Sequence, residues 1–119
     1  MKEWVEFLNL EEAMKKDLNL TLESRMVMLC EEVQETVQAV AKGDREEIVD
    51  GLGDTVVVAL STLIALGVDP EHLIKVIHRA NMTKVKGPKS GRVLTGPDAG
   101  KTDDWIAPNH SNNLGILGE

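Results

Sequence analysis

The spacing of apolar residues predicts four α-helices in the first part of the chain. The first helix is expected over about residues 2–16, with Trp4, Phe7 and Leu8 near one face. The second is expected to begin at Thr21, because threonine is a good N-cap residue. Its apolar positions recur at spacings of three and four, which is the helical period. These positions are Leu22, Met26, Leu29, Val33, Val37 and Val40.

Glycine and an aspartate mark the junction between the second and third helices. Gly43 is expected to end the second helix, since glycine readily adopts the left-handed conformation of a helix stop. Asp44 and Glu47 have the spacing of a capping box, so the third helix is expected to start there. That helix is predicted to continue to about Leu66, with Gly67 as its stop.

The third helix is apolar nearly all round from Val56 to Leu66. The run of three valines at its start is also compatible with a buried β-strand. A helix is the better interpretation, because no alternation or hairpin signal accompanies the run. A helix without a polar face must be covered on every side. We therefore expect a homodimer or homotetramer with this helix at its centre.

The fourth helix is predicted to open at Asp69 and Pro70, an N-cap followed by proline, and to reach about Met82. Residues 84–119 hold six of the ten glycines and three of the four prolines and show no periodicity. The predicted fold is all-α: an antiparallel four-helix bundle over residues 1–83, with a loop-rich C-terminal segment in the same single domain. This segment is expected to wrap over the bundle or stay partly mobile, with its last ten residues disordered or ordered by a partner.

Composition and charge limit the classes of function. A single cysteine allows no intramolecular disulfide, and the charged N-terminus is unlike a signal peptide, which favours a cytoplasmic protein. The longest uncharged run, Thr55 to Gly67, is shorter than a membrane span requires, so no membrane partner is expected. The net charge of −7 argues against nucleic-acid binding. Residues 1–74 carry a balance of −10 and residues 75–119 one of +3, which suits a site where carboxylates and cations face one polyanion.

Five carboxylates form two clusters on consecutive predicted helices: Glu31, Glu32, Glu35, Asp50 and Asp54. Residues on a helix are about 100° apart, so each cluster leaves its helix within one narrow sector. The short turn makes the two helices antiparallel neighbours and puts the clusters at about the same height. Carboxylates that converge in this way repel each other unless a cation joins them. Oxygen ligands suit Mg²⁺, or Mn²⁺ as an alternative, and such ions serve phosphate chemistry. Helices rich in solvated glutamate are the competing interpretation.

Cationic and amide side chains follow near the end of the fourth helix and in the tail. Arg79 and Lys84 can hold phosphate oxygens, and Asn81 can bond to a sugar or a phosphate. Cations at this place also complement the helix dipole, which is a sufficient role for any one of them. Lys101 follows a glycine in the tail, where a lysine can close over a bound anion.

Three segments together resemble the all-α nucleoside triphosphate pyrophosphohydrolases, the superfamily of MazG, dimeric dUTPases and phosphoribosyl-ATP pyrophosphohydrolase. They are Arg25–Glu35, Asp44–Asp54 and His78–Lys84. The resemblance implies a helical dimer or higher oligomer that requires Mg²⁺. Such an enzyme cleaves a nucleoside triphosphate between the α and β phosphates, and the resemblance points to a canonical or modified dNTP in nucleotide pool control or sanitation. A non-catalytic nucleotide-sensing or protein-binding dimer of the same fold is the alternative.

The resemblance also assigns roles to single residues. Glu32, Glu35 and Asp54 are expected to ligate metal, with Glu31 and Asp50 as further ligands or as the base that activates water. Contacts to sugar and phosphates are expected from Asn81, Lys84, Lys101 and Arg79. Two positions depart from the superfamily's pattern. Gly51 stands where MazG-type members have glutamate, although Asp50 matches a phage-like branch that is similar to purine dNTP hydrolases. Phe7 and Leu8 stand where that branch often has Phe-His, so the preferred base stays open.

Overall fold

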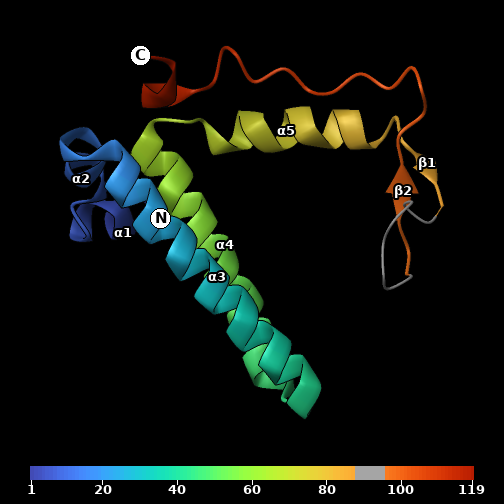
Figure 1. The fold of residues 1–119 in the computed structure, drawn as a ribbon, viewed down its shortest axis with the longest axis horizontal. Helices are drawn as coiled ribbons and strands as arrows, with labels where there is room; N and C mark the ends of the chain where they lie inside the picture. The colour runs from blue at the N-terminus through green and yellow to red at the C-terminus, as the bar shows by residue number, and fades with distance from the viewer. Residues whose placement is uncertain (88–95) are drawn as a thin grey trace. The chain divides into compact units, whose positions relative to one another are not determined.

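A computed structural model of the chain describes residues 1–87 and 96–119, and this part is mostly helical (Figure 1). The prediction of a mainly α-helical protein is therefore confirmed. Residues 88–95 of the predicted loop-rich segment lie outside the described residues. In chain order the helices and strands are α1 (Lys2–Phe7), α2 (Leu10–Lys16), α3 (Leu18–Lys42), α4 (Arg45–Leu66), α5 (Pro70–Asn81), β1 (Val85–Lys86), β2 (Ala99–Gly100) and the 3-10 helix η1 (Gly115–Gly118).

The chain divides into two compact units. The first unit comprises Met1–Pro70 and Leu114–Glu119, and the second comprises Glu71–Asn113. Each unit is described by itself below. The antiparallel four-helix bundle and the single domain with a boundary near residue 83 stay predictions.

Helices α3 and α4 form an antiparallel hairpin that dominates the first unit (Figure 1). Gly43 ends α3 with a left-handed φ of 69°, and Gly67 ends α4 with a φ of 83°, as their positions in the sequence predict. Asp44 caps α4, because its Oδ1 accepts a hydrogen bond of 3.2 Å from the backbone N–H of Glu47. The valine run at residues 56–58 lies inside α4, which excludes the strand interpretation.

The N-terminal region differs from its prediction. The structure has two short helices instead of one, because Asn9 adopts a left-handed conformation with a φ of 51°. Asparagine tolerates this conformation better than most residues, so the chain turns here and a new helix begins. The turn buries Val5, Leu10 and Met14. Trp4 and Phe7, expected on the apolar face, are 44% and 75% exposed.

The start of α3 is also earlier than predicted. Asp17 is its N-cap, since Asp17 Oδ1 accepts a hydrogen bond of 3.1 Å from the backbone N–H of Leu20. Thr21 lies one turn inside the helix and does not cap it. Its hydroxyl donates instead to the carbonyl oxygens of Ala13, at 3.0 Å, and Asp17, at 2.7 Å. Thr21 therefore fastens α3 to the end of α2.

The last residues of the chain are ordered against α4, contrary to the expected disorder. The 3-10 helix η1 begins at Gly115, which has a left-handed φ of 56°. Its Cα region lies so close to the carbonyl of Leu66 that a Cβ at residue 115 would overlap it. Only glycine combines this φ with this close approach, so Gly115 allows the C-terminus to dock at the end of α4.

Helix α4 is long and apolar enough, by length and composition, to cross a membrane. Only 22% of its most apolar window is buried within this chain. A central helix of an oligomer has the same composition, and the window includes the carboxylates Asp50 and Asp54. Length and hydropathy alone do not assign this helix to a bilayer, and the absence of a membrane partner stays a prediction.

Candidate functional site

The α3–α4 hairpin places four of the predicted carboxylates on one of its faces. The two helices meet through Thr36 and Ala39 on α3 and Gly51 and Thr62 on α4, which are buried. Four carboxylates, of which three are exposed and Asp54 is half-buried, come directly before residues of this contact surface and are turned about 100° away from it. Because the helices are antiparallel, the same rotation turns residues of both helices to the same side. These acidic residues are Glu31, Glu35, Asp50 and Asp54.

Glu32 lies among them and is half-buried between the helices. Its pKa is raised above the ordinary value, first by partial burial and then by the negative charges of the surrounding carboxylates. In decreasing order of effect these are Glu35, Asp54, Asp50 and Glu31. The structure thus brings the other four carboxylates within electrostatic reach of Glu32. Without a cation the arrangement is repulsive.

The donor set of this acidic face suits a hard cation, since every side-chain donor is a carboxylate oxygen. Over residues 1–87 and 96–119, however, no group of three or more Asp, Glu, His or Cys side chains is arranged to hold a metal ion. The side chains of the acidic face therefore do not form a complete metal coordination site by themselves. Mg²⁺ usually takes one or two protein carboxylates and completes its shell with water and substrate phosphates, which fits a face of this kind.

Gly51 and Thr36 set how closely the two helices approach beside the acidic face. A Cβ at position 51 would overlap the hydroxyl of Thr36 and lie 3.1 Å from its Cβ. The same hydroxyl donates a hydrogen bond of 2.7 Å to the carbonyl of Glu32, one turn earlier on α3. Gly51 is thus a point of close approach between α3 and α4, and it lies at the height of the carboxylates. The glutamate that MazG-type members carry here would not fit this hairpin.

Arg25 is a buried cation that the sequence analysis did not single out. It is 5% exposed, and its guanidinium donates to the hydroxyls of Ser61, at 2.6 Å, and Thr62, at 3.0 Å. It forms no salt bridge with a carboxylate within the described ranges. Burial lowers its pKa. The signal in the sequence was an arginine within an apolar helical stripe, opposite two hydroxyl residues in the apolar part of α4.

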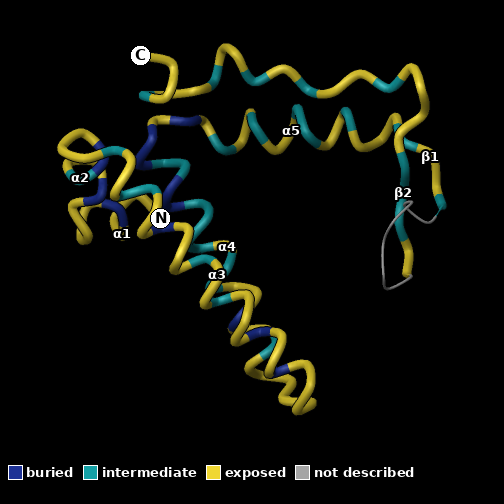
Figure 2. The backbone as a smooth tube through the Cα atoms, viewed as in Figure 1, coloured by how far each residue is buried: buried dark blue, intermediate teal, exposed yellow. Residues whose placement is uncertain are grey.

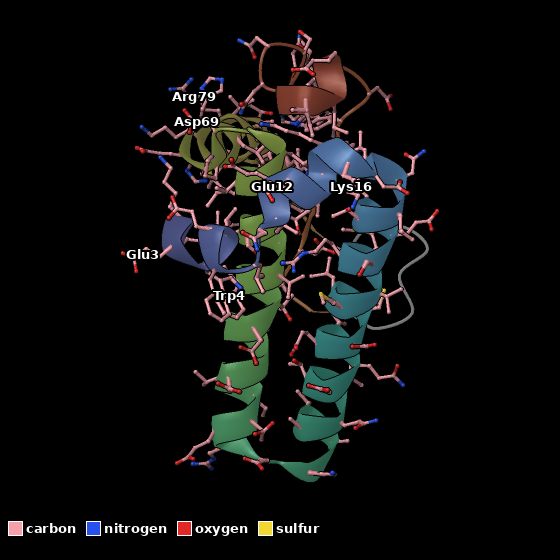
Figure 3. The ribbon with its side chains drawn as sticks, turned by 90° about the vertical axis from the view of Figure 1, so that its left-hand side faces the viewer. Glu3, Trp4, Glu12, Lys16, Asp69 and Arg79 are labelled. Atoms are coloured by element: carbon pink, nitrogen blue, oxygen red, sulfur yellow. The ribbon has the colours of Figure 1, made fainter. Side chains whose placement is uncertain are left out.

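An exposed aromatic pair lies on α1, beside α4. Figure 3 shows Trp4 at the side of α4, and its ring stacks on that of Phe7 with centroids 5.5 Å apart and an interplanar angle of 11°. Both rings line a pocket of about 510 Å³ together with Val57 of α4. Val57 comes one helical turn after Asp54 and about 60° around α4 from it, toward the side of α4 that faces away from α3. The sequence analysis placed these rings near one face of the first predicted helix but did not predict their exposure.

The second unit contains the predicted phosphate and sugar contacts. Asn81 is exposed at the end of α5, and Arg79, also exposed, lines a pocket of about 450 Å³ beside Trp105. The ammonium groups of Lys84 and Lys101 both lie over the indole ring of Trp105, 5.3 and 4.9 Å from its centroid. These cations belong to the second unit and the acidic face belongs to the first.

Comparison with known proteins identifies the family. A sequence profile of phosphoribosyl-ATP pyrophosphohydrolase matches residues 10–81, which span α2 to α5 and include the whole acidic face. Searches of curated proteins and of solved structures found no match. Members of this family are pyrophosphohydrolases that act on nucleotide triphosphates. The chain belongs to the phosphoribosyl-ATP pyrophosphohydrolase family, within the MazG-like superfamily of all-α nucleoside triphosphate pyrophosphohydrolases.

Proposed function

We propose that this protein is a Mg²⁺-dependent pyrophosphohydrolase that converts a canonical or modified deoxynucleoside triphosphate to the monophosphate and pyrophosphate. The observation that carries the proposal is the acidic face, where four carboxylates surround a fifth, Glu32, whose pKa is raised by partial burial and by their negative charges. Repulsion among these carboxylates destabilises the folded protein, and a divalent cation held by them would relieve it and would neutralise phosphate charge. We further propose that the reaction serves nucleotide pool control in the cytoplasm.

The reaction requires only the displacement of one oxygen by another at the α-phosphorus. The oxygen of a water molecule bonds to the α-phosphorus, the bond from this phosphorus to the α–β bridging oxygen breaks, and pyrophosphate leaves. A proton of the water passes to a carboxylate, for which the exposed Glu31 and Asp50 are the candidates. Glu32, Glu35 and Asp54 would hold Mg²⁺, or Mn²⁺. When bound, the ion supplies neutralisation of the phosphate charge and orientation of the reacting groups.

The aromatic pair on α1 is the proposed contact for the base. Stacking on an exposed aromatic ring is the usual way in which proteins hold a base without a fixed sequence preference. Trp4 and Phe7 offer such a surface, and the pocket that they line reaches Val57, one turn along α4 from Asp54. A nucleotide whose base lies on this pair would have its phosphates directed to the acidic face of the same unit.

The exposed apolar surface of the hairpin supports a homodimer or homotetramer. Its residues come directly after residues of the contact surface, so they point to the side opposite the acidic face. Figure 2 shows the half of the hairpin near its turn as mostly exposed. An exposed apolar surface of this extent marks an interaction site in a soluble protein. Its large apolar side chains, each 45–72% exposed, are Met26, Val33, Val37, Val40, Val49, Leu52 and Val56.

A nucleotide panel tests the proposed function. Each dNTP, each NTP and phosphoribosyl-ATP is incubated with the protein and Mg²⁺, and released pyrophosphate is measured. We expect release from at least one deoxynucleotide, its loss with EDTA, and its abolition in Glu35→Gln. The matched control is Glu23→Gln, because Glu23 is an exposed glutamate of α3 on the side away from Glu32.

The outcomes separate this function from the non-catalytic alternative. Tight nucleotide binding without pyrophosphate release from any substrate would establish a nucleotide-sensing module instead. Wild-type turnover in Glu35→Gln would refute the assignment of the acidic face. Equal losses in Glu35→Gln and Glu23→Gln would also refute it, because the effect would then follow from lost charge anywhere on α3.

A further inference from the structure

We propose that Trp105 is a positioning residue, which holds Lys84 and Lys101 together as a binding site for a polyphosphate chain. The proposal rests on the proposed function, since it assigns the polyphosphate of the substrate, or the released pyrophosphate, to this site. All three residues belong to the second unit, Glu71–Asn113.

The strand register places the two lysines opposite each other. Val85 pairs with Gly100 and Lys86 pairs with Ala99 in the antiparallel pair of β1 and β2. Continued by one residue, the same register sets Lys84 opposite Lys101. Two like charges directly opposite each other across antiparallel strands are unfavourable. An arrangement that brings two ammonium groups together therefore needs a compensating group.

Trp105 supplies part of this compensation. The negative face of an indole ring attracts ammonium groups, and both lysines lie within cation–π distance of its centroid, at 5.3 and 4.9 Å. Neither ammonium forms a salt bridge with a carboxylate in the part of the chain that the structure describes. Both charges are therefore held by a neutral ring and stay available to an anion.

The ring itself is fixed in place at the end of α5. Its Nε1–H donates a hydrogen bond of 3.0 Å to the carbonyl of Ala80, in the last turn of the helix. The same carbonyl accepts a hydrogen bond of 2.7 Å from the hydroxyl of Thr83, just before Lys84. Trp105 is half-buried, whereas Lys101 is exposed. The indole of Trp105 thus connects the segment that carries Lys101 to the last turn of α5, just before Lys84.

The ligand that fits is a chain of phosphates. Each ammonium lies about 5 Å from the same centroid, so the two nitrogens are at most about 10 Å apart. Two lysines at such a separation can hold neighbouring phosphate groups of one chain, each as a point charge. A bound phosphate chain would draw the ammonium groups away from the ring, and the emission of the indole would change.

Tryptophan fluorescence tests this site directly. The protein has two tryptophans, Trp4 and Trp105, so Trp4→Phe leaves Trp105 as the only reporter. This variant is titrated with inorganic tripolyphosphate, and separately with pyrophosphate, in EDTA. We expect a saturable change in emission, and an affinity about tenfold weaker when Lys84→Met or Lys101→Met is added. The control is Lys75→Met, because Lys75 belongs to the same unit and already pairs with Glu71 at 3.2 Å.

Substitution of the ring separates its two contributions. Trp105→Phe keeps an aromatic face and loses the hydrogen bond to Ala80, whereas Trp105→Leu loses both. With tripolyphosphate binding measured by calorimetry, we expect affinity to fall in the order wild type, Trp105→Phe, Trp105→Leu. In turnover, Trp105→Leu should raise KM about tenfold with kcat within about twofold. A merely structural role would lower the fraction of active protein, and so kcat, and leave KM unchanged.

Three results would overturn the proposal: no saturable change in Trp105 emission, an equal loss of affinity in Lys75→Met, or wild-type affinity in Trp105→Leu. These results are distinct from a failure of the proposed function, because the titrations need neither metal nor turnover. Tripolyphosphate binding without nucleotide hydrolysis would support this site and refute only the enzyme. Tighter binding of pyrophosphate than of tripolyphosphate would assign the site to the product.

Discussion

Gly51→Ala should destabilise the protein although alanine is the better helix former. In an open helical position, alanine is favoured over glycine by about 1 kcal/mol. At position 51 the new methyl group would overlap the hydroxyl of Thr36 and lie 3.1 Å from its Cβ and 3.4 Å from its Cα. Rotation of the hydroxyl relieves only the first contact, so α3 and α4 must also move apart. Overpacking of this kind costs about 1–3 kcal/mol.

Gly53→Ala is the matched reference. Gly53 is exposed in the same helix, and a Cβ there has nothing within 4 Å. The difference between the two variants cancels the helix preference of alanine. We expect Gly51→Ala to be less stable than Gly53→Ala by about 1–3 kcal/mol in urea unfolding followed by circular dichroism. Measurement at two protein concentrations separates this difference from any effect on association.

A second substitution tests the cause. Thr36→Ala removes the hydroxyl that the new methyl group meets, so Thr36→Ala with Gly51→Ala should recover about half of the loss. The reasoning would be refuted if Gly51→Ala were as stable as Gly53→Ala, because the helices would then not be in close contact at this point. It would also be refuted if Thr36→Ala gave no recovery.

Three further predictions concern the same hairpin. Because the pKa of Glu32 is raised, the folded protein holds the proton of this carboxyl more tightly than the unfolded chain does. The metal-free protein should therefore lose stability as the pH rises from the ordinary pKa of 4.5 through the raised pKa. Glu32→Gln should flatten this part of the pH dependence in thermal unfolding, and an unchanged slope would contradict the assignment. Arg25→Met should change the free energy of unfolding by no more than about 1 kcal/mol, measured in urea. Burial disfavours the charged guanidinium, and the hydroxyl of Ser61 keeps its hydrogen bond to the carbonyl of Val57 in the variant. A loss above about 3 kcal/mol would show instead that the cation stabilises the fold. Val37→Lys, at a position that is 61% exposed, should leave the circular dichroism spectrum unchanged and shift sedimentation to the monomer, whereas an unchanged oligomer would exclude this surface from the interface.

Signals that act within a few residues predicted the helix boundaries well. Gly43, Asp44 and Gly67 work through their own backbone conformation or side chain, and the structure has each in its predicted role. The errors lie where a distant contact decides. Thr21 is a good N-cap by type, but its hydroxyl is engaged by Ala13 of α2, and Asp17 caps the helix instead. No local rule anticipates that choice.

The same division holds for the candidate site. The grouping of the carboxylates followed from the rotation of 100° per residue and the short turn, which need no knowledge of packing. The burial of Arg25 and the pairing of Lys84 with Lys101 depend on which elements meet, so the residue types alone did not reveal them. The exposure of the aromatic pair was not predicted for a related reason. Its position depends on the turn at Asn9, a single left-handed residue inside an otherwise helical pattern.

The close approach at Gly51 also explains why this chain departs from the acidic pattern of MazG-type members. A residue at position 51 points at α3, and a Cβ there would overlap the hydroxyl of Thr36. A carboxylate can reach the acidic face only from a neighbouring position that is turned away from the contact. Asp50 is such a position: it is exposed, and its charge contributes to the raised pKa of Glu32. Position 50 can therefore supply the carboxylate that position 51 cannot. We infer that, in a hairpin packed this closely, the fourth carboxylate around Glu32 has to come from position 50, one residue nearer the N-terminus of α4 than position 51.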